Sequence, residues 1–170
     1  MKKFLPILLL AFVGLFIFSC KDDTDYDTYS KSTDATGTFT SAGSWTLSLD
    51  ITIQNTDVVL VYRRVGNMWE SIPKTYYLDN VSGYPTGREL DYNFDFNTQE
   101  VNIRTAANFN QQTQMSPSEA AQYLANQTFR IVLVPASAAK NVNTVDKTDY
   151  NAVIKYYNID ESRIKTYSFK

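Results

Sequence analysis

Two carboxylates spaced four residues apart are the first candidates for chemistry in this sequence. Asp91 and Asp95 share one face of a predicted strand over residues 90–96, where apolar and polar side chains alternate. Four residues at about 3.3 Å each separate the two side chains by about 13 Å. Glycosidase carboxylate pairs lie roughly 5–9.5 Å apart, so this pair would need a carboxylate from another element. The pattern favours a solvent-facing strand.

The composition excludes several other kinds of site. The 170 residues contain no histidine and one cysteine, which excludes Ser-His-Asp catalysis, histidine-based metal sites and an internal disulfide. The common nucleotide-binding glycine motifs are absent, so no cofactor is expected. With 16 basic and 18 acidic residues, the net charge is −2, which argues against nucleic acid as a partner. We therefore predict no enzymatic activity, leaving a carboxylate-based hydrolase as the remaining enzymatic alternative.

Arg63 and Arg64 directly follow a continuous apolar run over residues 58–62. That run predicts a strand buried on both faces. Either arginine could bind an anion with its guanidinium group. A strand end that reaches water is the simpler explanation for the pair.

Aromatic side chains form a second group of candidates, with 12 tyrosines, 10 phenylalanines and 2 tryptophans in the chain. Exposed tyrosine and tryptophan rings stack on sugars and anchor protein partners. The candidate ligand-binding aromatics are Trp45, Trp69, Tyr76, Tyr77 and Tyr84. The alternative is that they fill the core, because aromatic residues favour strands.

Cys20 is the residue with the most specific chemistry. It ends a basic and then apolar N-terminus, whose apolar stretch over residues 4–18 is shorter than the roughly 20 residues that cross a bilayer. The segment Ile17-Phe18-Ser19-Cys20 resembles a lipobox, in which the cysteine sulfur receives a diacylglyceryl group. We predict a signal peptide over residues 1–19 and lipidation of Cys20. The alternative is an ordinary secretory signal that ends near a cysteine.

The residues after Cys20 resemble a sorting signal. Lys21, Asp22 and Asp23 are similar to the lipoprotein export signal of Bacteroidota, which implies the outer face of the outer membrane. A solvated acidic linker would have the same composition. The segment over residues 20–44 is polar and rich in Asp, Thr and Ser, so it predicts a flexible tether. A single β-rich domain is expected over residues 45–170.

Hydrophobic periodicity predicts many short strands and two helices in that domain. The expected strands cover residues 45–53, 58–62, 69–72, 75–78, 90–96, 101–103 and 129–134. One helix should begin at Ser116, with Glu119 completing a capping box, and another should begin at residue 148 or 149. Residues 164–169 predict a final strand or a docked tail. The fold class is therefore mainly β, an antiparallel β-sandwich with one or two short helices.

From Val58 to Tyr157 the chain resembles a family of small, uncharacterised Bacteroidota lipoproteins. The residues that carry the resemblance are 58–63, 73–77, 92–96, 129–136 and 149–153. Some members bear the name dihydrolipoamide dehydrogenase, but this sequence lacks the dinucleotide glycines, the redox cysteine pair and the histidine of that enzyme. The resemblance implies no transferable activity.

These observations predict a membrane-anchored lipoprotein of the cell envelope, with a non-enzymatic structural or protein-interaction role. The alternative is a glycan- or ligand-binding module at the cell surface. The expected partners are the membrane, through lipid on Cys20, and an envelope protein or a glycan.

Overall fold

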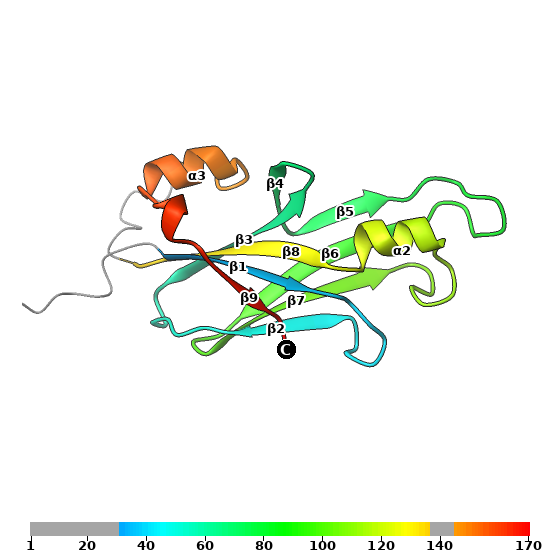
Figure 1. Cartoon of the computed structure of the whole chain (residues 1–170), viewed down its shortest axis with the longest axis horizontal. Helices are drawn as coiled ribbons and strands as arrows, with labels where there is room; N and C mark the ends of the chain where they lie inside the picture. Colours follow the sequence, from blue (N-terminus) through cyan, green and yellow to red (C-terminus); the bar gives the residue numbers. More distant parts are fainter. Residues whose placement is uncertain (1–30, 137–144) are drawn as a thin grey trace, which may run out of the picture.

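Two β-sheets packed face to face form the body of the protein (Figure 1). The structure is a computed structural model that describes residues 31–136 and 145–170. The five-stranded sheet has the order β4-β3-β8-β1-β9 and the four-stranded sheet the order β2-β7-β6-β5. The predicted mainly β, sandwich-like fold is confirmed. No helix in these two ranges is long and apolar enough to span a bilayer.

The four-stranded sheet follows the predicted period of two. It comprises β2 (Thr46–Asp50), β5 (Lys74–Tyr77), β6 (Glu89–Phe96) and β7 (Glu100–Ala107), all paired antiparallel. Leu90 and Tyr92 of β6 are fully buried, whereas their neighbours Asn93 and Asp95 are exposed. Alternation therefore places an apolar face against the other sheet and a polar face in solvent.

The central strands of the five-stranded sheet, β3 and β8, are covered on both faces. It comprises β1 (Lys31–Gly37), β3 (Val58–Val65), β4 (Met68–Ser71), β8 (Gln127–Val134) and β9 (Lys165–Ser168). In β8, Phe129 and Ile131 face the sandwich core, while Val132 and Val134 pack with the second cluster, which includes Val153 of α3 (Tyr150–Tyr156). A strand buried on both faces is what its continuous apolar run predicts.

The predicted tether end at residue 44 needs correction, because Lys31–Gly37 already form strand β1 of the sandwich. Strand β1 lies between β8 and β9, and its register pairs Lys31 with Leu133 and Gly37 with Gln127. Its sequence is polar, with Ala35 as its one fully buried side chain. Hydrophobic periodicity does not detect such a strand, because backbone pairing and polar contacts hold it in place rather than an apolar face.

The C-terminal segment closes one side of the sandwich. Strand β9 pairs parallel with β1, so the sheet is not wholly antiparallel. Beyond it, the backbone N–H of Phe169 donates to the carbonyl of Thr36, and that of Lys170 donates to the carbonyl of Ser48 in the other sheet. The Phe169 ring lies 6.1 Å from the Phe129 ring. The predicted final strand and the predicted docked tail are both present.

Two short helices and a turn of 3-10 helix (η2, Glu161–Arg163) complete the fold. Helix α2 (Pro117–Tyr123) has Ser116 as its N-cap and the predicted capping box with Glu119. Helix α3 has Asp149 as its N-cap. In Figure 1, α3 covers the outer face of the sheet beside β4, and α2 lies at the opposite end of the sandwich.

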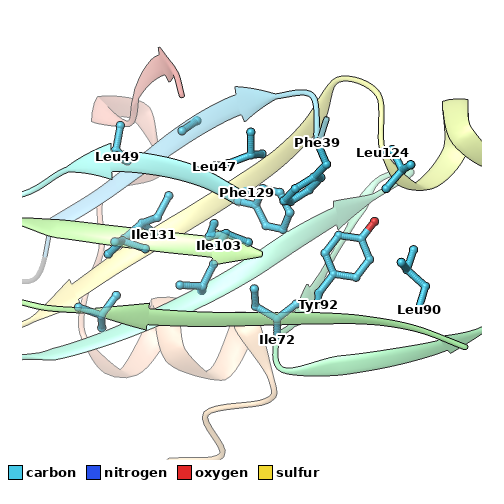
Figure 2. Packing of buried hydrophobic residues seen from close by; sticks show 14 of the residues in the cluster. Phe39, Leu47, Leu49, Ile72, Leu90, Tyr92, Ile103, Leu124, Phe129 and Ile131 are labelled. Carbon is cyan, nitrogen blue, oxygen red and sulfur yellow. The ribbon is translucent and has the colours of Figure 1, made fainter. Parts of the chain in front are cut away.

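The main core lies between the sheets (Figure 2). Phe39 contacts the rings of Tyr92 and Phe129 edge-on, with centroids 5.8 and 6.0 Å apart. Leu47 and Ile103 pack against them from the four-stranded sheet. This rigid core positions the strand ends that carry the polar side chains described below.

Candidate functional site

Three arginines are buried in the part of the chain that the structure describes. Arg63 of β3, Arg88 before β6 and Arg130 of β8 are 3%, 1% and 8% exposed. A guanidinium group stays charged at all relevant pH values, so each burial requires compensating partners. The three sites differ in how they meet that requirement.

Arg88 is neutralised by a carboxylate. Its Nη1 and Nη2 donate to the two oxygens of Glu119 at 2.9 and 2.7 Å, and also to the carbonyls of Gln114 and Asp79. Because Glu119 belongs to the capping box of α2, the pair joins this helix to the loop before β6. Hydrogen bonds from Arg88, opposed by burial, lower the pKa of Glu119 to about 2.

Arg130 is neutralised as well. It forms a bidentate contact with Asp34 of β1 and a 2.6 Å contact with Glu161 of η2. Its guanidinium carbon also lies 4.2 Å from the ring centroid of Trp69. The Tyr150 hydroxyl joins this group, so Arg130 connects β1 to α3 and η2. These contacts give Arg130 a structural role.

Arg63 differs from both, because no carboxylate in residues 31–136 and 145–170 forms a salt bridge with it. Its Nε and Nη2 donate to Oε1 of Gln127 at 2.9 and 2.7 Å, and Nη2 donates to the carbonyl of Gln122 at 2.8 Å. These acceptors are neutral. The simple expectation that this arginine reaches water at a strand end is wrong, whereas the neighbouring Arg64 is exposed.

Tyrosine rings surround the Arg63 guanidinium. The ring centroids of Tyr76, Tyr92 and Tyr123 lie 4.9, 4.8 and 5.6 Å from its central carbon. Such cation–π contacts stabilise a desolvated cation by about 2 kcal/mol or more. They supply partial negative charge but no formal counter-charge.

Tyr76 lies between Arg63 and the carboxylate of Glu70. The Tyr76 hydroxyl donates to Oε2 of Glu70 at 2.5 Å, and the Tyr76 ring centroid lies 4.9 Å from the guanidinium carbon of Arg63. Burial and the Glu70 hydrogen bond raise the pKa of Tyr76 to about 12. Burial raises the pKa of Glu70, but the hydrogen bonds from Tyr76 and Lys74 outweigh burial and lower this pKa below its ordinary value. Glu70 is itself paired with Lys74 at 2.9 Å.

A pocket of about 480 Å³ opens beside Arg63. The turn after β3, Tyr76 of β5, the C-terminal part of α2 and the start of β8 line it. Polar side chains make up most of its wall: Arg63, Arg64, Tyr76, Gln122, Tyr123, Asn126, Gln127 and Thr128. The volume falls within the range of small-molecule sites, roughly 300–1,000 Å³.

The five predicted aromatics do not form a common platform, since none contacts another by its ring. Trp45 is half-buried and packs against the main core. Trp69 packs between Arg130 and Tyr150, and Tyr84 lies over Arg88. Tyr77 is 75% exposed and stands apart. Of the five, Tyr76 alone lines the Arg63 pocket.

The predicted carboxylates do not converge. Asp91 accepts a hydrogen bond from Thr75, and Asp95 is paired with Arg104 on the solvent face of the sheet. Within the described ranges, no cluster of three or more Asp, Glu, His or Cys side chains could hold a metal ion. The solvent-facing interpretation of this strand is therefore the one that fits.

The remaining predicted sites, namely Cys20, Lys21, Asp22 and Asp23, lie outside the described residues. Gln122, Tyr123 and Gln127 were not predicted as site residues. Their positions next to Arg63 depend on the return of the chain from α2 into β8, at a distance of about 60 residues in sequence. Two features of the sequence pointed to this site: an arginine directly after a buried run, and Tyr76 among the candidate ligand-binding aromatics.

No protein-family model, no curated protein and no solved structure matches the chain.

Proposed function

We propose that this protein is a lipid-anchored lipoprotein of the cell envelope whose sandwich acts as a non-enzymatic binding module for a small polar ligand. The sequence favours a structural or protein-interaction role, with ligand binding as the alternative. The Arg63 pocket supports the alternative, because it offers a concave polar wall of suitable size. The envelope location rests on the lipobox and on the acidic residues after Cys20.

One observation carries the binding role. Arg63 is 3% exposed, has no carboxylate partner in the described ranges and forms part of a pocket wall. A buried charge that is only partly compensated is costly for a folded protein. A charge held in a pocket wall at such a cost suits recognition of a ligand rather than stability.

The pocket wall also argues against hydrolysis by carboxylates. No aspartate or glutamate is among the residues that line it. General acid–base catalysis needs a titratable group within hydrogen-bond reach of the substrate. Two tyrosines, Tyr76 and Tyr123, line the pocket, and the hydroxyl of Tyr76 already donates to Glu70.

The proposed anchor is compatible with the position of the first described strand. Strand β1 begins at Lys31, eleven positions after Cys20. A chain of that length spans at most about 40 Å. The sandwich would therefore stay close to the bilayer, where a receptor of modest affinity benefits from the high local concentration of envelope ligands.

A glycan array probed with the full-length lipidated protein in nonionic detergent tests the binding role. Ala121 lines the pocket from the exposed side of α2, so Ala121→Trp should fill the pocket without disturbing the core. Ser118→Trp, on the same helix but away from the pocket, is the matched control. We expect glycan binding that Ala121→Trp abolishes and Ser118→Trp preserves. Binding unaffected by Ala121→Trp, or one stoichiometric protein partner from intact cells without any glycan, would contradict the proposal.

A further inference from the structure

We propose that the pocket selects a sugar acid, and that the Arg63 guanidinium binds its carboxylate. This inference rests on the proposed binding role and names its ligand class. It follows from the charge at the base of the pocket and from the chemistry of the pocket rim.

The charge balance is the first step. Arg88 and Arg130 are neutralised by Glu119 and by the Asp34–Glu161 pair, whereas Arg63 contacts amide and carbonyl oxygens and tyrosine rings. The Gln122 carbonyl lies near the end of α2, where the helix dipole contributes roughly half a negative charge. Glu70 lies beyond Tyr76 but is itself paired with Lys74, so the surroundings compensate Arg63 only in part, and an anion would complete the compensation.

Of the three guanidinium nitrogens of Arg63, Nη1 has no hydrogen bond to Gln122 or Gln127, so a carboxylate would bind there. Arg63 already uses Nε and Nη2 for Gln127 and Gln122, and these bonds hold the guanidinium plane in place. The tyrosine rings also restrain it. A fixed guanidinium loses little entropy when it binds a planar anion, which favours a carboxylate.

The rim indicates what carries the carboxylate. Gln122 and Asn126 are exposed and line the pocket with amide groups that can donate to and accept from hydroxyls. The apolar positions of the wall are small or flank the turn, namely Val65, Gly66, Ala121 and Ala125. The apolar tail of a fatty acid would offer these amides no hydrogen-bond partners, so it matches the polar rim poorly. A ligand rich in hydroxyl groups, such as a uronic acid, matches both features.

Calorimetric titration of the full-length lipidated protein in nonionic detergent tests this inference. The probes are digalacturonate, the neutral disaccharide digalactose, sodium acetate and inorganic phosphate. We expect digalacturonate to bind at least about tenfold more tightly than any of the other three, because it alone combines the carboxylate with hydroxyls.

Two variants at one exposed position separate charge from shape. Ala121→Glu places a carboxylate at the pocket, and Ala121→Gln places an uncharged side chain of the same size there. We expect Ala121→Glu to weaken digalacturonate binding at least about fivefold more than Ala121→Gln, through repulsion and competition for Arg63. Equal effects of the two variants would overturn the role of charge. These variants avoid Arg63 itself, whose replacement would disturb folding.

The other outcomes distinguish this inference from the proposed function. Digalactose binding as tight as digalacturonate binding, and abolished by Ala121→Trp, would overturn the sugar-acid inference and leave the binding role in place. Tighter binding of phosphate or acetate than of digalacturonate would also overturn it. If no probe and no array glycan binds in a manner that Ala121→Trp prevents, both the inference and the binding role fail.

Discussion

Glu119 has two structural roles in one side chain. It accepts both Nη groups of the buried Arg88, and its Oε2 accepts the backbone N–H of Ser116. Removing one partner of a buried ion pair leaves the other charge uncompensated, which costs more than the pair itself contributes. The Arg88–Glu119 pair therefore holds the loop before β6 against α2, next to the wall of the Arg63 pocket.

The Glu119→Gln variant should be less stable at pH 7 by about 3 kcal/mol, because Arg88 stays buried without its counter-charge. Urea unfolding followed by circular dichroism measures the change. Glu89→Gln alters an exposed carboxylate and should shift the free energy of unfolding by less than about 0.5 kcal/mol. A Glu119→Gln protein as stable as the Glu89→Gln control would show that the pair is dispensable.

The same pair predicts a pH dependence of stability. The pKa of Glu119 is about 2 in the folded protein, below the ordinary value of 4.5. Its contribution is therefore fully present above about pH 4.5 and is lost as the pH falls from there toward 2. The free energy of unfolding of the wild type should decrease over this interval more steeply than that of Glu119→Gln. Parallel pH profiles of the two proteins would contradict this expectation.

At the scale of elements, the stability of helix α2 depends on its N-terminal cap. It is only seven residues long, too short to be stable by propensity alone. Ser116 accepts the N–H of Glu119, and Glu119 reciprocates toward the Ser116 backbone. Since the C-terminal part of α2 lines the Arg63 pocket, this cap also positions the candidate site.

Ser116→Ala should lower the free energy of unfolding by about 1 kcal/mol, because it removes the capping hydroxyl. Thermal and urea denaturation provide the measurement. Ser118, the second residue of α2, is exposed, so Ser118→Ala serves as the control. Its free energy of unfolding should remain within about 0.5 kcal/mol of the wild-type value. Equal stability of the two variants would argue that packing alone holds α2.

Helix α3 is held by packing on the outer face of the five-stranded sheet. Val153 is fully buried in the cluster that also contains Val132 and Val134 of β8. We expect Val153→Ala to lower the free energy of unfolding by about 2 kcal/mol, through lost apolar burial and a residual cavity. Asn151→Ala changes an exposed position of the same helix and should be nearly neutral. Urea unfolding measures this change, and hydrogen exchange would detect whether α3 opens before the rest of the sandwich. A Val153→Ala variant as stable as the wild type would show that the helix is not docked as described.

For the molecule as a whole, the proposed lipid on Cys20 decides where the sandwich works. Mass spectrometry of the mature protein should find an N-terminal Cys20 with a diacylglyceryl thioether. The Cys20→Ser variant should lack the lipid and retain residues 1–19, because lipidation precedes cleavage at a lipobox. Ser19→Ala keeps a small residue before the cysteine and should be processed normally. A mature chain that begins at another residue, or an unacylated Cys20, would contradict the anchor.

Surface exposure is a separate prediction. Replacing Lys21, Asp22 and Asp23 with alanine should leave the lipid in place but protect the protein from protease added to intact cells. The double variant Asp25→Ala and Asp27→Ala removes the same number of acidic residues nearby and should stay accessible. Equal protease sensitivity of both variants would show that the three residues do not direct export.

Local patterns in the sequence were sufficient for much of the fold. The alternation over residues 90–96, the apolar run of β8 and the capping box at Ser116 each predicted an element that the structure contains. These signals are local, because side-chain periodicity and capping depend on residues a few positions apart.

Strand β1 and the Arg63 site were decided only by tertiary structure. The polar sequence of β1 becomes a strand because β8 and β9 provide backbone partners on both sides. Arg63 is buried because Gln127, about 60 residues further along the chain, and the end of α2 fold over it. Neither partner is specified by neighbouring residues, since burial of a polar side chain depends on acceptors that only the packed fold brings within reach.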